Sequence, residues 1–488
     1  MKPLKYKIIT SFQTNFSYAT KAMENNMHAK TYEGAIDALN EVQSNTEYIR
    51  NYLIRPKHET NLPTVAKYLK RSGLELKDLD KLSVIHVTGT NGKGTTCAYT
   101  ERILRSHGYS TGFFSSPHLL NVRERIRLNG KPVSKPEFAK YFWKIYDTLD
   151  SQKENPSDMP LYFRFLTLMA LHMFLDKKVD VAILEVGIGG EYDCTNIVRK
   201  TEVVGITPLD LDHVSMLGDT LESIAWNKSG IMKEGCSAFT TNQPPEVLNV
   251  FKERSKEKKC TLKVIDNNNY SKNCSNIPFH VKKTNASLAF SLAEAYINRD
   301  KNGNKTFDPE LAIKSIEETH WPGRYEIIRN ENLTYYLDGA HTLDSLRICK
   351  NWYISHTRNS DRKKCLVFNM TGTRDLNEFF NELNHIRFDL VVFIPNVSGV
   401  SDKADTANFK FPEEKQLLKC HEYKTKWLEM YGSDSSSSPC VHVFPSFSQA
   451  ANFFKQSGDC DVLVTGSIHL IGAALSILDP TLNGTLLD

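Results

Sequence analysis

The sequence lacks long apolar runs, clustered cysteines and an excess of one charge sign. No apolar stretch approaches the roughly 20 residues of a membrane-spanning helix, so we expect no transmembrane segment. Lys and Arg total 61 against 57 Asp and Glu, and the signs are interleaved, so we expect no nucleic-acid partner. The 10 cysteines include no Cys-x-x-Cys pair and no zinc-like spacing with histidine, which predicts reduced thiols in an intracellular compartment.

The most informative stretch is a β-branched run at 84–96 that ends in a glycine-rich turn before a helical pattern. Its glycines let the backbone turn tightly and bring N–H groups close to phosphate oxygens; they are Gly89, Gly92 and Gly94. The start of the following helix adds the positive end of its dipole. The turn therefore predicts a site for a nucleoside triphosphate.

Within this turn, Lys93 is expected against the β- and γ-phosphates, and Thr95 or Thr96 can offer a hydroxyl to Mg²⁺. The turn is shorter than the usual P-loop, because only Thr90 and Asn91 separate the first glycine from the second. A shortened P-loop of this kind narrows the choice of superfamily.

Alternating strand and helix patterns begin near Tyr32 and predict an α/β fold with a mostly parallel sheet. Strands are expected at 82–87, 112–115, 181–185, 203–207 and 238–240, with helices at 95–106, 163–174 and 221–231. A second series follows Trp321, with strands expected at 333–337, 364–369, 390–394 and 462–465. These patterns predict an N-terminal P-loop ATPase domain at 29–318 and a smaller Rossmann-like α/β domain at 319–488.

Polar residues follow two of these strands. Glu185 ends a buried-type strand, and Asp212 and His213 come shortly after the next one. Because ligands of open α/β sheets gather beyond the carboxyl ends of strands, Glu185 is placed to bind a metal. His213 is placed to complete the metal shell or to orient a phosphate. A structural role remains the alternative for each residue.

A third polar turn, at 112–119, contains Ser115, Ser116, Pro117 and His118. Ser116 is a candidate metal ligand, and the loop is a candidate receiver of a planar substrate. Three arginines follow, at 123, 125 and 127. They are candidates for carboxylate binding, or they lie on the solvated side of an amphipathic strand.

The ordered set of motifs resembles the folylpolyglutamate synthase family, part of the Mur-ligase superfamily of ATP-dependent acid–amino-acid ligases. The resemblance runs from about Tyr32 to the C-terminus. Its N-terminal motifs are Val-Thr-Gly-Thr-Asn-Gly-Lys-Gly-Thr at 87–95, Phe-Phe-Ser-Ser-Pro-His-Leu at 113–119 and Glu-Val-Gly-Ile-Gly-Gly at 185–190. Its C-terminal motifs are Trp-Pro-Gly-Arg at 321–324 and Tyr-Leu-Asp-Gly-Ala-His at 336–341.

The resemblance implies an ATP site at 89–96, with Asn285 facing adenine and with Arg324, Asp338 and His341 reaching it from the C-terminal domain. It implies Mg²⁺, in two sites, held by Ser116, Glu185 and His213 with Thr95 as a further ligand, and allows a monovalent cation such as K⁺. The implied catalytic residues are Lys93, His213 and Lys228. Lys228 matches a lysine that is carbamylated in parts of the superfamily; an unmodified lysine capping phosphate is the alternative.

The implied reaction adds L-glutamate to the γ-carboxylate of tetrahydrofolate or of a folylpolyglutamate, through an acyl phosphate. Its products are folate polyglutamates, which the cell retains for one-carbon metabolism, and the implied substrate-binding residues are Ser115, Pro117 and His118. The alternatives are dihydrofolate synthase, which adds the first glutamate to dihydropteroate, and a P-loop phosphotransferase. We expect a monomer.

The first 28 residues carry lysines but no acidic residue before Glu24. Such a composition is similar to a mitochondrial presequence, although arginine is missing, and a disordered tail is the alternative. Met23 and Met27 are possible later starts for a cytosolic form. The expected locations are therefore mitochondrial, in the matrix or at the inner membrane, and cytoplasmic.

Overall fold

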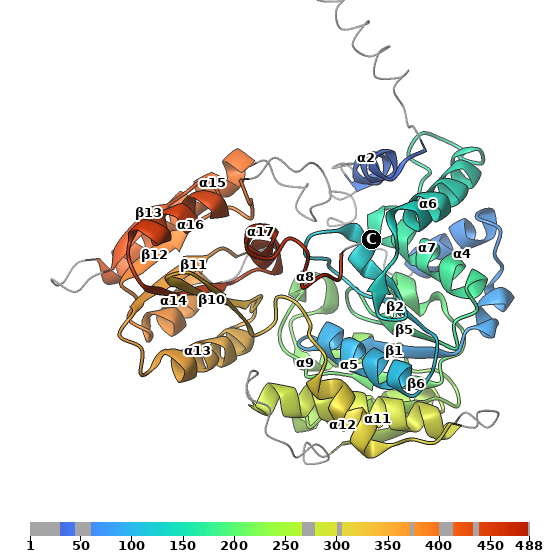
Figure 1. Cartoon of the computed structure of the whole chain (residues 1–488). Helices are drawn as coiled ribbons and strands as arrows, with labels where there is room; N and C mark the ends of the chain where they lie inside the picture. Colours follow the sequence, from blue (N-terminus) through green and yellow to red (C-terminus); the bar gives the residue numbers. More distant parts are fainter. Residues whose placement is uncertain are drawn as a thin grey trace, which may run out of the picture.

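The computed structural model describes residues 30–43, 60–265, 279–299, 305–370, 375–399, 413–432 and 439–486. Figure 1 shows two α/β units side by side, each built around its own sheet. The expected presequence at 1–28 lies outside the described residues. No helix within those ranges is long and apolar enough to cross a membrane.

The first sheet has eight strands in the order β4-β3-β2-β5-β1-β6-β7-β8. From β2 to β8 all neighbours are parallel, whereas β3 and β4 add an antiparallel edge. The strands are β1 (Val84–Thr88), β2 (Thr111–Phe114), β3 (Ile126–Leu128), β4 (Lys131–Pro132), β5 (Val181–Glu185), β6 (Val203–Ile206), β7 (Ser237–Thr240) and β8 (Thr261–Val264).

Helices cover both faces of this sheet. Successive strand residues point to opposite faces, so each strand packs against both helix layers. Ile85 and Val203 pack with α5, α11 and α12, while Ala182 and Val204 face α6, α7, α9 and α10. The helices of this unit are α2 (Tyr32–Gln43), α4 (Asn61–Arg71), α5 (Lys93–Ser106), α6 (Lys135–Asp150), α7 (Tyr162–Asp176), α8 (Val214–Leu217), α9 (Leu221–Ser229), α10 (Pro245–Glu257), α11 (Phe279–Arg299) and α12 (Pro309–Glu317).

The second sheet has six strands in the order β13-β12-β11-β14-β10-β9, all parallel except the edge strand β9. Its strands are β9 (Glu326–Asn330), β10 (Leu333–Asp338), β11 (Lys363–Phe368), β12 (Leu390–Phe393), β13 (Cys440–Val443) and β14 (Cys460–Thr465). Its helices are α13 (Leu343–Thr357), α14 (Leu376–Asn384), α15 (Glu413–Tyr431), α16 (Phe447–Gln456) and α17 (Ile468–Leu478).

The α/β fold expected from the sequence is confirmed, with one mostly parallel sheet in each half of the chain. All nine expected strands form, within two residues of their expected limits. The strands that the sequence did not predict are β3, β4, β8, β9 and β13. β4, β8, β9 and β13 are the edge strands of the two sheets, and β3 lies next to the edge strand β4.

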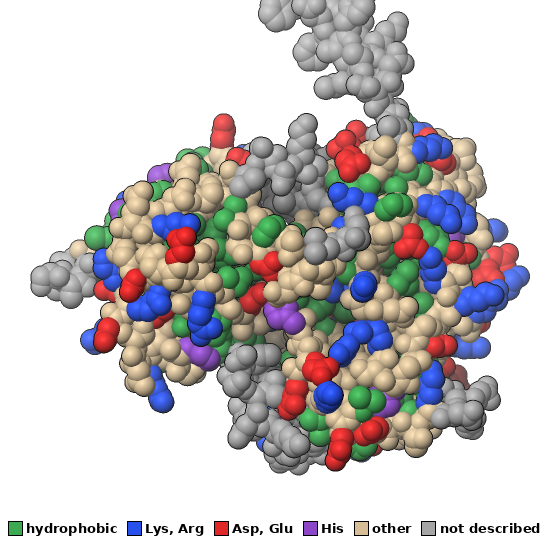
Figure 2. All heavy atoms as spheres, in the orientation of Figure 1, with side chains coloured by type: hydrophobic (Ala, Val, Ile, Leu, Met, Phe, Trp, Pro, Cys, Tyr) green, Lys and Arg blue, Asp and Glu red, His purple; other side chains and the backbone are tan. Residues whose placement is uncertain are grey.

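The two units meet through loops at the carboxyl ends of their strands and through the end of the chain. Leu486 accepts a hydrogen bond at its carbonyl from Arg123 (3.4 Å), so the C-terminal segment returns to the first unit, as Figure 1 also shows. On the face visible in Figure 2, acidic and basic side chains are mixed rather than gathered by sign.

Candidate functional site

A cavity of about 1260 Å³ lies between the two sheets. Its wall in the first unit comes from loops that follow β1, β2, β5 and β6, and its wall in the second from loops that follow β10, β11, β12 and β14. Ligands of parallel α/β sheets bind at this end of the strands. The ligand-binding edges of both sheets therefore face the same cavity.

The turn between β1 and α5 depends on glycine at two positions. Gly89 has φ 142°, and a Cβ there would lie 1.9 Å from Thr207 Oγ1. Gly92 has φ 88°, and a Cβ there would lie 2.3 Å from Asn285 Oδ1. The backbone of this turn thus packs directly on the loop after β6 and on α11, with no room for a side chain.

Hydrogen bonds fix the same turn against the loop after β6. The N–H groups of Thr90 and Asn91 both donate to the Pro208 carbonyl, at 3.1 and 3.2 Å. Thr90 Oγ1 also donates to the Asp210 carbonyl (3.1 Å). These amides are therefore used to hold the turn, and the first-turn amides of α5 are left for an anion.

Lys93 is the first residue of α5, and its Nζ donates to the Thr90 carbonyl at 3.3 Å. The ammonium group thus lies above the turn, on the wall of the cavity. The next residue, Gly94, is close to two other groups: a Cβ there would lie 3.4 Å from Trp321 Nε1 and 3.5 Å from both Glu185 carboxylate oxygens. The start of α5 consequently faces a carboxylate and an indole N–H.

The Glu185 side chain ends β5 and is only 4% exposed. Its Oε2 accepts the Ser116 N–H at 3.0 Å. Burial raises the pKa of Glu185, and the opposing effects of Lys93, the Ser116 N–H, Arg324 and Arg125 favour its ionised form. A buried carboxylate among these groups is suited to a cation or to a cationic part of a ligand.

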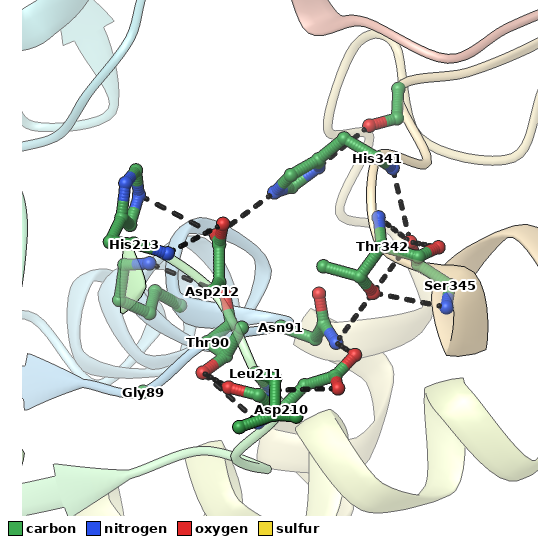
Figure 3. A network of polar contacts seen from close by, with 12 residues as sticks. Gly89, Thr90, Asn91, Asp210, Leu211, Asp212, His213, His341, Thr342 and Ser345 are labelled. Carbon is green, nitrogen blue, oxygen red and sulfur yellow. Dashed lines mark hydrogen bonds and ion pairs between the residues drawn. The ribbon is translucent and has the colours of Figure 1, made fainter. Parts of the chain in front are cut away.

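The loop after β6 joins the two units in a polar network, shown in Figure 3. The Asp212 carboxylate lies 3.5 Å from His213 Nε2 and 3.7 Å from His341 Nε2. Asn91 Nδ2 donates to Thr342 Oγ1 of the second unit at 3.3 Å. His213 has φ 53°, a left-handed conformation that is uncommon for residues other than glycine.

The second unit contributes a buried carboxylate, Asp338, at the end of β10. Its Oδ2 accepts the Tyr325 N–H at 3.1 Å. Burial raises the pKa of Asp338 to about 6, against the opposing effects of Arg324, the N–H groups of Tyr325 and Ala340, and His341. Arg324 therefore lies near both Asp338 and Glu185, one from each unit.

Lys228 is buried behind the glycine-rich turn, where its Nζ donates to the Gly89 carbonyl at 2.6 Å. Burial and the nearby charge of Lys93 lower the pKa of Lys228 well below its usual value, while Asp212 and Asp193 oppose the shift. A lysine in this environment readily gives the neutral amine. It supports the turn from below rather than lining the cavity.

Most of the predicted site residues line the cavity. They are Thr90, Asn91, Gly92, Lys93, Gly94, Thr95, Ser115, Ser116, Pro117, Glu185, His213, Asn285, Arg324, Asp338 and His341. Four lie behind its wall: Gly89, Thr96, His118 and Lys228. Within the described ranges, no group of three or more His, Cys, Asp or Glu side chains is arranged to hold a metal.

Of the two alternatives for the arginines, the one that makes them solvated is wrong, although Arg127 does lie on a strand, β3. Arg123 and Arg125 lie on a 3-10 helix (Val122–Arg125), and all three arginines are at most 7% exposed. Arg125 Nε donates to His118 Nδ1 (2.9 Å), which holds His118 away from the cavity, and Arg127 lies 4.9 Å from the Trp321 ring. The 3-10 helix breaks the alternation that the spacing suggested.

Sequence reasoning did not assign Trp321, Asp210 or Thr342 to the site. Trp321 lines the cavity and packs on Phe113 at 5.7 Å between ring centroids. The signal for Trp321 was its place beside Arg324, and the signal for Asp210 was its nearness to Asp212. No local pattern links Thr342 to Asn91, because the two are 251 residues apart.

Comparison with known proteins identifies the relatives of this chain. The Mur ligase middle domain family matches residues 87–297. The mitochondrial folylpolyglutamate synthase of Bos taurus is 37% identical and aligns over 93% of this chain and 93% of its own length.

Two solved structures have the same fold. Mycobacterium tuberculosis folylpolyglutamate synthase complexed with ADP and AMPPCP has a TM-score of 0.70 at 23% identity, covering 86% of this chain and 95% of that one. The bifunctional folylpolyglutamate synthase/dihydrofolate synthase of Yersinia pestis, complexed with AMPPNP and a Mn ion, has a TM-score of 0.65 at 25% identity, covering 86% and 93%.

Proposed function

The chain belongs to the folylpolyglutamate synthase family of ATP-dependent ligases, and we propose that it adds L-glutamate to the γ-carboxylate of tetrahydrofolate and folylpolyglutamates. The observation that carries this proposal is the cavity between the units. It brings the glycine-rich turn and Glu185 of the first unit together with Arg324 and Asp338 of the second. A ligase needs this convergence, because nucleotide, acceptor and amino acid must meet in one space.

ATP is proposed to lie with its phosphates on the first turn of α5. The first amides of α5, which as at any helix start have no acceptor within the helix, and the Lys93 ammonium group are suited to the β- and γ-phosphates. Asn285 packs against Gly92 and is the candidate contact for adenine. Arg324, Asp338 and His341 line the opposite wall and would hold the nucleotide from the second unit.

The groups around Glu185 fit a divalent cation. Glu185 is buried beside Lys93, and the neighbouring hydroxyls and imidazole line the same cavity: Thr95, Ser116 and His213. Mg²⁺ is usually held by one or two carboxylates together with water and phosphate oxygens, so a cluster of three acidic or imidazole side chains is not required. When bound, the ion neutralises charge on the phosphates.

We propose two Mg²⁺ sites, with K⁺ as a further cation. A carbamate on Lys228 would supply the second site with a carboxylate, and the lowered pKa of Lys228 supports it by making the neutral amine available to CO₂. Mass analysis in bicarbonate tests this point, because finding only unmodified Lys228 removes the carbamate and leaves a lysine that supports the turn.

The proposed reaction has two stages. The γ-carboxylate of the acceptor attacks the γ-phosphorus of ATP, and Lys93 stabilises the charge that develops as ADP leaves. The amine of L-glutamate then attacks the acyl phosphate and expels phosphate, which leaves a γ-linked amide. Closure of the two units over the cavity excludes water from the acyl phosphate.

The acceptor is proposed to enter beside the loop after β2, where Ser115 and Pro117 line the cavity. His118 lies behind this wall and is held by Arg125, so its proposed part is to support the loop rather than to touch the acceptor. The chain is proposed to act as a monomer, since one chain provides both walls of the cavity.

Dihydrofolate synthase and a P-loop phosphotransferase are the competing functions. Incubation with MgATP and L-glutamate, with tetrahydrofolate and dihydropteroate in separate reactions, followed by product masses, separates them. Glutamyl additions to tetrahydrofolate support the proposal. Addition to dihydropteroate alone would support the synthase, and phosphoryl transfer without glutamate would support the phosphotransferase.

Residues 1–28 are proposed to direct import into mitochondria, to the matrix or the inner membrane, with Met23 or Met27 starting a cytoplasmic form. The relative from Bos taurus is named as mitochondrial, which supports the first part. A fluorescent fusion of residues 1–30 tests both parts. Diffuse cytosolic fluorescence with a mature chain that begins at Met1 would contradict import.

A further inference from the structure

Two cysteines lie side by side at an edge of the first sheet, away from the cavity. Cys236 directly precedes β7, and Cys260 directly precedes β8. The strands pair in parallel with Ser237 opposite Thr261, so the register continued by one residue puts Cys236 opposite Cys260. Both side chains pack into the cluster beneath α9 and α10.

Backbone hydrogen bonds hold this pair in place on both sides. The Gly235 N–H donates to the Lys259 carbonyl (3.0 Å), and the Thr261 N–H donates to the Cys236 carbonyl (3.3 Å). Neighbouring strands lie roughly 4.8 Å apart, and disulfides join Cα atoms that are about 4.4–6.8 Å apart. A disulfide between these residues therefore fits the sheet with little movement of the backbone.

The surroundings favour a thiolate in this pair. The neighbouring Cys260 thiol, the Lys233 N–H (3.5 Å) and the charge of Arg299 lower the pKa of Cys236, whereas Cys236 and burial raise the pKa of Cys260. Arg299 is fixed there because its guanidinium donates to the Gly235 carbonyl and to Ser237 Oγ, both at 3.1 Å. Thiolates, not thiols, attack oxidants.

Exposure distinguishes this pair from the other cysteines of the described ranges. Cys260 is partly exposed, whereas Cys236 is buried behind it. A second pair of neighbouring thiols, Cys365 and Cys460, is fully buried in the core of the second sheet. Cys440 is exposed. The chain thus contains an accessible pair, an inaccessible pair and an exposed single thiol for comparison.

We propose that Cys236 and Cys260 are a reversible modification site, which hydrogen peroxide oxidises to a disulfide between β7 and β8. In the first step, a thiolate of the pair attacks a peroxide oxygen and becomes a sulfenic acid, while the O–O bond breaks and water forms. The other thiol then attacks the sulfenic sulfur, the S–O bond breaks, and a second water leaves. Two thiols lose two electrons and two protons, and hydrogen peroxide takes up both.

The bridge would join the two ends of the β7–α10–β8 crossover. It would thereby restrict the unfolded chain and fasten the edge strand β8, which raises the melting temperature of the oxidised protein. Neither step uses the nucleotide cavity, so the inference does not depend on the proposed ligase activity.

The test uses the full chain, reduced with dithiothreitol and then treated with hydrogen peroxide. Free thiols are alkylated before intact-mass measurement and non-reducing peptide mapping. We expect two fewer alkyl groups than in the reduced control, one cross-linked peptide pair containing Cys236 and Cys260, and full reversal by dithiothreitol. Cys260→Ser should abolish the cross-link and the rise in melting temperature, and the control Cys440→Ser should keep both.

Several outcomes would overturn the proposal. These are a wild-type map without the Cys236–Cys260 peptide pair under conditions that oxidise Cys440, a cross-link between Cys365 and Cys460 instead, or irreversible oxidation of Cys236 to sulfinic acid. The wild-type map decides the matter even if Cys260→Ser does not fold.

Discussion

Single residues set the shape of the glycine-rich turn and the charge above it. Gly89 and Gly92 have left-handed φ values and contact Thr207 and Asn285 at distances that exclude a side chain. Lys93 lies at the start of α5, close to the backbone of the turn. There its ammonium group would neutralise charge on the bound phosphates. Removing the charge of Lys93 should therefore affect turnover, whereas adding a side chain to the glycines of the turn should affect stability.

Lys93→Ala should reduce turnover by about 10³-fold, because the variant loses the charge that stabilises the transferring phosphoryl group. The fold should change little, since Lys93 makes one hydrogen bond, to a carbonyl in its own turn. Steady-state turnover and circular dichroism check the two halves of this prediction. The exposed Lys131→Ala is the control, and normal turnover by Lys93→Ala would refute the site assignment.

Gly89→Ala should lower the free energy of unfolding by about 3 kcal/mol, because its Cβ would overlap Thr207 Oγ1 and the backbone must shift. Gly73→Ala is a matched control: its φ is +93° and no atom lies within 4 Å of the added Cβ. It should cost about 1 kcal/mol from the left-handed conformation alone. Urea denaturation measures both, and equal losses would show that Thr207 does not restrict the turn.

At the scale of elements, the sequence predicted the central strands and not the edges. Runs such as Val181–Glu185 are buried throughout and almost entirely apolar, so the local sequence is enough to predict them as strands. Thr261–Val264 and Cys440–Val443 are partly exposed, and their mixed polarity gives no such signal. Edge strands depend on a neighbour to pair with, and that neighbour is not visible in local sequence.

The site residues also fall into those that local sequence predicts and those that it does not. Glu185 was predictable because it ends a buried strand and strand ends point to the ligand edge, whereas Asp338, which ends β10, was expected only from the family resemblance. The burial of Arg125 and its bond to His118 were not, because they depend on a 3-10 helix within an expected strand. Contacts between units, such as Asn91 with Thr342, depend on how two separately folded sheets meet.

Asp338, at the end of β10, should make stability depend on pH. Burial raises the pKa of Asp338 to about 6, from about 3.9 in the unfolded chain. Between these values the folded state keeps a proton that the unfolded state has lost, so this contribution to the free energy of unfolding falls as pH rises.

Asp338→Asn should remove this dependence. Relative to wild type, the unfolding free energy of the variant should rise by about 1 kcal/mol from pH 5 to pH 7.5. Urea denaturation at both pH values measures the change. A difference that is the same at the two pH values, or that falls, would show that Asp338 does not hold the extra proton.

At the scale of the whole molecule, one cavity depends on the arrangement of two sheets. The connection between them carries Trp321, whose ring packs on Phe113 and Arg127 of the first unit and whose N–H faces the start of α5. Movement of one unit against the other would therefore shift Trp321 relative to the start of α5, where the nucleotide is proposed to bind. Trp321 is a candidate positioning residue for this coupling.

Trp321→Phe should raise KM for ATP by about 3–10-fold with a smaller change in kcat, because the ring is retained and one N–H donor to the phosphate region is lost. Trp226→Phe is the control, since Trp226 is 41% exposed on α9 and does not line the cavity. ATP titrations followed by turnover and by tryptophan fluorescence measure the effect. An unchanged KM and an unchanged fluorescence response in Trp321→Phe would remove Trp321 from the nucleotide site.

The proposed ligase activity is tested most directly by phosphate release from MgATP with tetrahydrofolate, measured with and without L-glutamate and followed by product mass. We expect release that requires both substrates and products heavier by whole glutamyl units, and we expect neither in Lys93→Ala. Release that is independent of glutamate and folate, with no glutamylated product, would contradict the ligase and leave only a nucleotide-hydrolysing site.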